Sequence, residues 1–265
     1  MPATAARRRV LALALTAAVL VPLTACGDEE PAKDRKAGAA GTTPAADLTV
    51  LAASSLTDVF KTAGAAYEKD HPGTKVTFSF AGSQELAAQV RQGAPADALV
   101  TADTKTMDTL ASDTGTPTII AKNRLVIATT EGNPHKIDDL KDLADTKLKV
   151  VLAAPQVPVG RYSKKVLGAQ QVKVKPVSEE PNVRAVLSKV ELGEADAGLV
   201  YQTDASSADD KVDAVTIPDA QNAIADYPAA TLKTSKNSKA AAAFVAWLST
   251  PAAQKILRDA GFQQP

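Results

Sequence analysis

Val50-Leu51-Ala52-Ala53-Ser54-Ser55-Leu56 joins a short apolar run to the start of an amphipathic segment. The run from Leu48 to Ala53 has the length and composition of a buried strand. From Leu56 onward, apolar residues recur at helical spacing until His71-Pro72-Gly73 interrupts the pattern. The stretch therefore predicts a strand that leads directly into a helix, which is the repeating unit of α/β folds.

Three later stretches repeat this arrangement of a strand-like run followed by a helix start. They are Ala81-Gly82-Ser83-Gln84, Val157-Pro158-Val159-Gly160 and Pro181-Asn182-Val183-Arg184. None of the four helix starts has a cationic side chain in front of it. The first turn of a helix carries unpaired backbone N–H groups and roughly half a positive charge, so several such ends aimed at one point bind an anion. The sequence therefore predicts an oxyanion-binding protein.

Strand-like and helix-like segments alternate over the 219 residues from Asp47 to Pro265. Further strands are expected at 75–81, 98–101, 124–129, 148–153, 172–177, 198–201 and 214–217, and further helices at 86–91, 161–167 and 183–192. Two helices are expected at the end of the chain, one capped by Ser238 and one that begins at Thr250-Pro251 and stops before Gly261. This alternation predicts parallel sheets flanked by helices, with ligands at the carboxyl ends of the strands.

The first 26 residues have the features of a secretory signal. Three arginines at 7–9 precede an apolar run at 10–21 that is too short to span a bilayer. Leu23-Thr24-Ala25-Cys26 resembles the lipobox of bacterial lipoproteins, which implies that residues 1–25 are removed and that Cys26 is lipidated. An unmodified free cysteine is the alternative. Cys26 is the only cysteine, so a disulfide or a multi-cysteine metal site within the chain is excluded.

Residues 26–46 are predicted to form a disordered tether, because charged and small residues there leave almost nothing to bury. The whole chain has 30 basic and 30 acidic side chains. Removal of residues 1–25 takes away three arginines and leaves 27 basic side chains, so the mature net charge is near −3. A slightly acidic protein gives no support for nucleic-acid binding or for a polybasic membrane patch.

Six motifs, in order and spacing, resemble the molybdate-binding proteins of bacterial molybdate ABC importers. They are Val50–Thr57, Phe80-Ala81-Gly82-Ser83, Gly93-Ala94-Pro95-Ala96-Asp97, Val157-Pro158-Val159-Gly160, Asn182-Val183-Arg184 and Gly198-Leu199-Val200-Tyr201. Each motif alone is weak. The ordered set extends over some 215 residues, from about Leu48 to Ala260-Gly261-Phe262, and is specific.

The resemblance implies a type II periplasmic-binding-protein fold of the α/β class, with a mainly parallel sheet flanked by helices in each of two lobes. Residues 47–123 with 230–265 are expected to form lobe I and residues 124–229 lobe II. The hinge is then expected at two chain crossings, near 124–128 and 227–231. The implied protein is a monomer without a cofactor, lipid-anchored at the outer face of the cytoplasmic membrane. It captures molybdate, and tungstate with it, for a permease driven by a cytoplasmic ATPase.

The family's anion ligands carry over to five positions, and no protein atom binds the molybdenum directly. The five are Ser55 and Ser83 by hydroxyl and amide, Val159 and Val183 by main-chain N–H, and Tyr201 by its phenol. Ser54, directly before Ser55, is the alternative for the first ligand, and Gly82 is a further candidate. Neutral N–H and O–H donors suit a dianion, because hydrogen bonds to a charged acceptor are strong.

Each of these residues also has an ordinary structural explanation. Ser55, Ser83 and Asn182 are residue types favoured as helix caps in any protein. Tyr201, taken alone, is more often a core residue at the end of a strand with its hydroxyl satisfied locally. The convergence of several such residues from distant segments is what favours a binding site.

Other oxyanions are the alternative within binding proteins. Molybdate, tungstate and sulfate carry no proton at neutral pH, whereas phosphate does and needs an acceptor such as Asp58 or Asp204 turned inward. Sulfate differs from molybdate mainly in size, which a sequence does not display. Arg161 and Arg184 follow two of the proposed amides, and we expect them to face solvent or pair with a carboxylate rather than contact the anion.

An enzyme is the alternative from another class of protein. The sequence has no Gly-x-Ser-x-Gly elbow, no phosphate-binding loop of the Walker type, no His-Glu-x-x-His and no dinucleotide fingerprint. His71 and His135 both adjoin prolines in loop-like segments, and neither is placed to activate a serine. No enzyme is therefore expected. An adhesin or scaffold lipoprotein would not require convergent polar helix starts.

Overall fold

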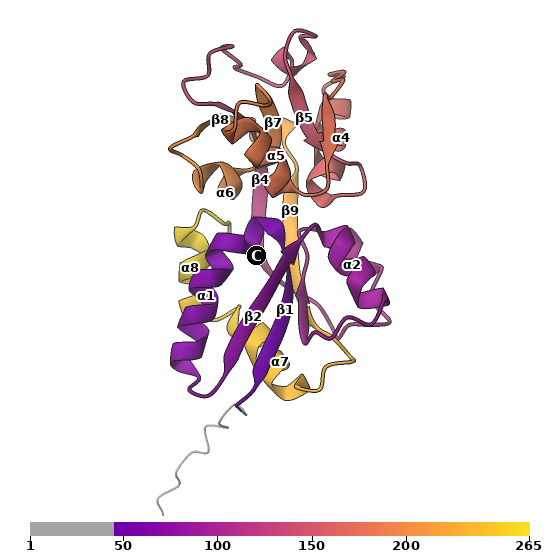
Figure 1. Ribbon diagram of the computed structural model, residues 1–265, viewed down its shortest axis with the longest axis vertical. Coiled ribbons are helices and arrows are strands. Elements are labelled where there is room, and N and C mark those ends of the chain that lie inside the picture. The colour runs from indigo at the N-terminus through magenta and orange to yellow at the C-terminus, as the bar shows by residue number, and fades with distance from the viewer. Residues whose placement is uncertain (1–44) are drawn as a thin grey trace, which may run out of the picture. The chain divides into compact units, whose positions relative to one another are not determined.

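The first predicted unit forms strand β1 (Asp47–Ala53), the short 3₁₀ helix η1 (Ser54–Leu56) and helix α1 (Thr57–Asp70). The computed structural model describes residues 45–265, so the predicted signal peptide, Cys26 and almost all of the tether lie outside the described residues (Figure 1). Within residues 45–265, no helix is both long enough and apolar enough to cross a membrane.

β1 is the middle strand of a first parallel group. β2 (Lys75–Ala81) and β3 (Ala98–Val100) flank it, and both run parallel to it. Helix α2 (Ser83–Arg91) follows β2, and α3 (Thr104–Asp108) follows β3. The carboxyl ends of all three strands therefore meet at one edge of the sheet, where the chain turns into helices.

A second parallel group lies further along the chain. β5 (Val150–Ala153) pairs in parallel with β6 (Ser178–Glu180) and with β7 (Ala197–Tyr201). Each strand again leads into a helix: α4 (Pro158–Ala169), α5 (Val183–Glu191) and α6 (Gln202–Ser206). The remaining short 3₁₀ helices are η2 (Asp142–Ala144) and η3 (Asp219–Gln221).

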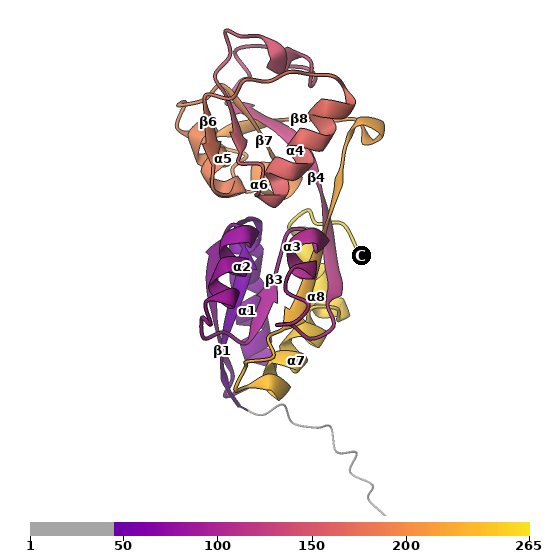
Figure 2. The same cartoon turned by 90° about the vertical axis from the view of Figure 1, so that its right-hand side faces the viewer.

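Two antiparallel strands join these groups, as Figures 1 and 2 show. β4 (Thr118–Thr130) pairs with β9 (Ile224–Thr231) up to Arg124, and beyond Arg124 it pairs with both β7 and β8 (Val212–Thr216). β9 also pairs with β3, so it belongs to the first sheet. We call the parts on either side of this junction the first lobe and the second lobe. The lobe limits and the hinge expected from the sequence stay predictions.

The strand expected at 172–177 is wrong. Only Ser178–Glu180 forms a strand there, and it pairs with β5. Pro176 has no N–H to donate to a sheet, and Val177 is 58% exposed rather than packed. The alternation of valine with lysine in this segment resembled a half-buried strand, but no partner strand lies beside it until Val177 bonds to the Val150 carbonyl.

The last two helices return to the first lobe (Figure 1). They are α7 (Ser238–Trp247) and α8 (Pro251–Asp259). The start and end predicted for α8 are confirmed, because the Thr250 hydroxyl accepts from the Ala253 N–H and Gly261 has a φ of +89°. Ser238 is not a cap: Asn237 holds the N-cap position, and no side chain caps that helix.

Strand β1 is apolar on both faces because both of its faces are covered. Leu48 and Val50 of β1 pack into one hydrophobic cluster, whereas Leu51 packs into a second cluster with Leu86 and Met107. Successive side chains of a strand point to opposite faces, so β1 is buried on each side. This burial fixes the position of the strand end from which Ser54 and Ser55 extend.

Candidate functional site

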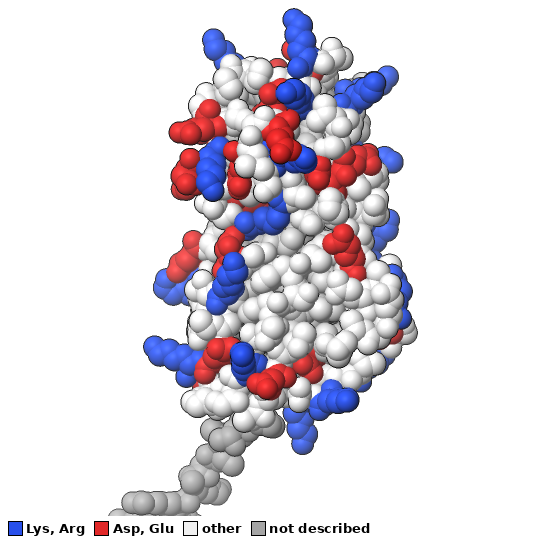
Figure 3. Space-filling model, viewed as in Figure 1, with Lys and Arg blue, Asp and Glu red and all other residues white. Residues whose placement is uncertain are grey.

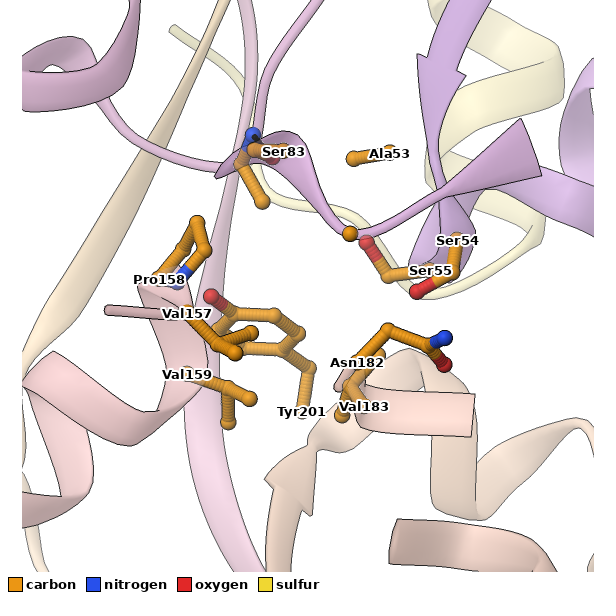
Figure 4. Close-up of a pocket in the computed structure, with 12 residues that line it drawn as sticks. Ala53, Ser54, Ser55, Ser83, Val157, Pro158, Val159, Asn182, Val183 and Tyr201 are labelled. Carbon is orange, nitrogen blue, oxygen red and sulfur yellow. Dashed lines mark hydrogen bonds between the residues drawn. The ribbon is translucent and has the colours of Figure 1, made fainter. Parts of the chain in front are cut away.

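The four predicted helix starts converge on one small cavity between the lobes (Figure 4). Every position singled out as an anion contact lines it: Ser54, Ser55, Gly82, Ser83, Val159, Val183 and Tyr201. Ala102, which the sequence did not indicate, lines it as well. The structure thus brings the seven residues together, and their role as ligands stays a prediction.

Ser55 is not a helix cap. It lies in the middle of η1, and neither η1 nor α1 has a side-chain cap at its start. Its side chain is 3% exposed, and its hydroxyl lies 2.9 Å from the hydroxyl of Tyr227. The short helix between β1 and α1 therefore holds the Ser55 hydroxyl inside the molecule, at the cavity wall.

Ser83 is the first residue of α2, and its hydroxyl has one defined partner. The Ser83 Oγ accepts a hydrogen bond from the Ala102 N–H at 3.0 Å, and the residue is 2% exposed. A hydroxyl that accepts in this way keeps its own proton free to donate. Ser83 therefore faces the cavity as a donor, held by the loop that follows β3.

Gly82 occupies the N-cap position of α2, with ordinary extended dihedrals. A Cβ at this position would lie 2.5 Å from the carbonyl oxygen of Pro181, which belongs to the second lobe. The neighbouring Gln84 side chain donates a hydrogen bond to that same carbonyl at 2.7 Å. The glycine thus permits close approach of the lobes, and the Gly82 N–H bonds the Glu85 carboxylate at 3.0 Å.

The second lobe presents two helix starts. Val159 lies in the first turn of α4, and Val183 is the first residue of α5. N–H groups in the first turn have no partner inside the helix, so both amides are available for an anion. Asn182 is the plain cap that its residue type suggests, because its side chain accepts from the Ala185 N–H at 3.0 Å.

Tyr201 ends β7 and points its phenol into the cavity (Figure 4). The residue is 1% exposed, and its hydroxyl has no hydrogen-bond partner among the described residues. Burial raises the pKa of this phenol well above its ordinary value, so the group stays protonated. A buried donor without a partner costs about 1–3 kcal/mol, which makes the Tyr201 hydroxyl a candidate donor to a ligand.

The two arginines beside the cavity pair with carboxylates, as expected, and each of them reaches a carboxylate of the opposite lobe. Arg184 Nη2 lies 2.8 Å from Asp58 Oδ2, and Arg161 Nε donates to Asp103 Oδ2 at 3.0 Å. Arg161 also donates to the Thr106 hydroxyl at 2.7 Å. Together with Gln84 and the Pro181 carbonyl, these contacts join the lobes around the cavity.

No charged side chain of the described residues lines the cavity itself. On the face drawn in Figure 3, basic and acidic side chains are interspersed over both lobes and form no single-sign patch. Within residues 45–265, no group of three or more His, Cys, Asp or Glu side chains is arranged to hold a metal ion. The electrostatic attraction for an anion therefore comes from backbone N–H groups and hydroxyls at the cavity.

Asp204 is a buried carboxylate of the second lobe, and it does not line the cavity. Burial raises its pKa to about 6, and the Arg184 charge opposes that rise. Arg184 Nε lies 2.8 Å from Asp204 Oδ1, and the Tyr201 N–H donates to Oδ2 at 3.3 Å. Asp58 and Asp204 are therefore both engaged with Arg184 and do not supply the acceptor that a protonated oxyanion needs.

The other polar residues named in the sequence are structural. Asp103 caps α3 through the Thr106 N–H, and Asp97 accepts from the Thr49 N–H at 2.8 Å. His71 bonds the Tyr67 carbonyl, and neither it nor His135 lines the cavity with the serines. The cavity thus has no serine and histidine pair for nucleophilic chemistry.

Comparison with known proteins agrees with this geometry. The family model for bacterial extracellular solute-binding proteins matches residues 48–263. The chain is 41% identical to the molybdate-binding protein ModA of Mycobacterium tuberculosis strain H37Rv, over 96% of this chain and 98% of that protein. It is 33% identical to ModA of Haemophilus influenzae, over 82% of this chain and 90% of that protein.

Solved structures give the same fold. The substrate-binding domain of a molybdenum ABC transporter from Clostridium difficile, described as putative in its title, is 28% identical with a TM-score of 0.62, over 83% of this chain and 99% of that one. The periplasmic molybdate-binding protein of Azotobacter vinelandii has a TM-score of 0.71 at 24% identity, over 82% and 99% of the two chains. The sulfate-binding protein SubI of M. tuberculosis has a TM-score of 0.73 at 21% identity, over 82% and 86%.

Proposed function

The chain belongs to the family of bacterial extracellular solute-binding proteins, and we propose that it captures molybdate, and tungstate in the same way, for an ABC importer. Relatives that match between 81% and 96% of this chain carry the name molybdate-binding protein. The observation that carries the proposal is the buried Tyr201 hydroxyl, which has no hydrogen-bond partner in residues 45–265 and lies in a cavity that no charged side chain of those residues lines.

The proposed ligand set consists of donors. The set is Ser55, Ser83, Val159, Val183 and Tyr201, with Ser54 and Gly82 as further candidates. Hydrogen bonds from neutral donors to an ionised acceptor are shorter and about twice as strong as neutral ones. Four helix starts add their dipoles, which offsets part of the cost of removing a dianion from water.

This donor set favours an unprotonated oxyanion over phosphate. Hydrogen phosphate carries a proton that needs an acceptor, and the two carboxylates expected for that role, Asp58 and Asp204, are held by Arg184. Sulfate meets the same chemical requirement as molybdate and differs in size. The identity to molybdate-binding relatives supports molybdate over sulfate.

Capture is proposed to proceed by closure of two lobes, residues 47–123 with 230–265 and residues 124–229. Ser55 and Ser83 extend from one lobe, whereas Val159, Val183 and Tyr201 extend from the other. An anion that contacts both sets therefore stabilises the closed state. The loaded protein, a monomer without a cofactor, delivers the anion to a permease with a cytoplasmic ATPase. Lipidated Cys26 holds it at the outer face of the membrane.

Thermal unfolding of the chain from Cys26 onward, with Cys26→Ser to prevent lipidation, tests the ligand. Molybdate, tungstate, sulfate and phosphate are added separately. A ligand at about 100 times its dissociation constant stabilises the folded protein by about 2.7 kcal/mol. We expect molybdate and tungstate to raise the unfolding temperature. A rise with sulfate or phosphate alone would contradict the ligand and leave the fold intact.

A further inference from the structure

Tyr227 connects the two halves of the proposed site without lining it. It lies on β9, and its side chain is completely buried. Its hydroxyl is 2.9 Å from the Ser55 hydroxyl in the first lobe. Its ring packs edge-on against Tyr201, with centroids 5.9 Å apart, and against Phe262, with centroids 5.4 Å apart. One side chain on a strand that joins the lobes thus contacts a proposed ligand from each.

The hydrogen bond between Tyr227 and Ser55 has two possible directions. If Ser55 donated to Tyr227, its single proton would be used and the serine would offer only lone pairs to the cavity. If Tyr227 donates to Ser55, the serine proton is free for a ligand. The direction therefore decides whether Ser55 is a donor or an acceptor at the cavity wall.

The chemistry of the two hydroxyls favours donation from Tyr227 to Ser55. Their oxygens lie 2.9 Å apart, and both residues are buried. Burial raises the pKa of the Tyr227 phenol well above its ordinary value, so the group stays protonated. A phenol is a stronger donor and a weaker acceptor than the hydroxyl of a serine, because its proton is more acidic. Tyr227 therefore directs its proton to Ser55.

We propose that Tyr227 is a positioning residue that keeps Ser55 a hydrogen-bond donor and thereby makes the site selective for oxyanions that carry no proton. The proposal rests on the proposed function. Ser83 is held in the same way by the Ala102 N–H. Both serines thus accept one hydrogen bond from the protein and turn their protons to the cavity, but only the partner of Ser55 is a side chain that substitution can remove.

Tyr227→Phe removes the donor and leaves the ring packing in place. The Ser55 hydroxyl is then free to rotate and to accept as well as donate. We expect molybdate affinity to fall about tenfold, because the Ser55 proton is no longer directed to the anion. Affinity for hydrogen phosphate is expected to stay the same or rise, so that the ratio of the two affinities falls at least tenfold as well.

Titration calorimetry of the Cys26→Ser chain with molybdate and with inorganic phosphate measures this ratio. Tyr67→Phe is the matched control, because Tyr67 is another completely buried tyrosine of the first lobe that does not line the cavity. It is expected to leave both affinities unchanged. Thermal unfolding without ligand establishes that each variant is folded, and the ratio within one variant does not depend on its folded fraction.

A double-mutant cycle separates positioning from packing. In a Ser55→Ala background, Tyr227→Phe is expected to have no further effect on molybdate affinity. The proposal is overturned if Tyr227→Phe lowers molybdate affinity equally in both backgrounds. It is also overturned if Tyr227→Phe leaves the ratio of molybdate to phosphate affinity at the wild-type value. Ser55→Ala alone, which does not depend on the folding of the tyrosine variant, must lower molybdate affinity more than phosphate affinity. Wild-type protein that binds phosphate but not molybdate overturns the proposed function instead.

Discussion

Arg184 of α5 and Asp58 of α1 form an ion pair across the two lobes, with Arg184 Nη2 2.8 Å from Asp58 Oδ2. Arg184 directly follows Val183, whose amide is a proposed ligand, and Asp58 lies three positions after Ser55. The pair therefore lies beside the helix starts that line the cavity. Asp58 is exposed, so water screens the pair from its outer side.

Asp58→Asn is expected to weaken molybdate binding modestly. An exposed ion pair contributes about 0.2–1 kcal/mol, so the dissociation constant should rise by at most about fivefold, and added salt should reduce the difference. Titration calorimetry at low and high salt measures the effect. Asp259→Asn is the control, because the Lys255–Asp259 pair lies within α8 and joins no two lobes. An equal change in both variants would argue against a closing role for Asp58.

Tyr201→Phe should reduce anion affinity without loss of stability. The Tyr201 hydroxyl has no partner among the described residues, so its removal relieves a desolvation cost in the empty protein. A hydrogen bond to a charged group contributes about 1.5–3 kcal/mol, which predicts a loss of roughly 10- to 150-fold in molybdate affinity. Tyr67→Phe, which removes another unpartnered buried hydroxyl, should leave affinity unchanged. Unchanged affinity in both variants would refute the Tyr201 contact.

Gly82→Ala tests how closely the lobes must approach. The added Cβ would lie 2.5 Å from the Pro181 carbonyl, while the backbone dihedrals at position 82 are open to any residue. We expect unfolding without ligand to be unaffected and molybdate affinity to fall at least tenfold. Gly168→Ala is the control, because a Cβ there meets nothing within 4 Å. That helical substitution should stabilise the protein by up to about 1 kcal/mol and leave binding intact.

The raised pKa of Asp204 predicts how the stability of the protein changes with pH. Burial raises its pKa to about 6, above the ordinary value of 3.8, so the folded protein holds this proton more tightly than the unfolded chain. As pH falls through about 6, the wild type should gain stability relative to Asp204→Asn, by at most about 1.4 kcal/mol per pH unit, until the ordinary pKa is reached. Denaturant unfolding of both proteins between about pH 7 and pH 5 measures the difference. A wild type that gains stability relative to Asp204→Asn as pH rises would contradict the prediction.

Local sequence signals were sufficient to predict the helix starts and their convergence on one cavity. Gly82, Pro158 and Asn182 are residues whose backbone or capping preferences act within one turn, so a pattern along the chain identifies them. The strand expected at 172–177 shows the limit of such patterns, because a strand requires a partner that the pattern does not contain. Tyr227 was not found as a site residue for a similar reason: Pro228 interrupts its segment, and its role depends on Ser55, 172 positions away.

The arginine pairings were only half predictable. That Arg161 and Arg184 would pair with carboxylates follows from their residue type, but which carboxylates they contact depends on the closure of the lobes. Asp103 reaches Arg161 from the loop after β3, and this contact spans 58 positions of the chain. Only a folded arrangement of the two lobes brings such groups together.

Because Val183 and Arg184 are consecutive, an anion held by the Val183 amide would be coupled to the contact between Arg184 and Asp58. Separation of the lobes would break that contact, while Arg184 would stay paired with Asp204 of its own lobe. Asp58 would then lose its partner on the other lobe, and closure would restore it. A partner that docks across both rims would therefore meet a different arrangement of charges in the open and closed states, without any contact with the anion.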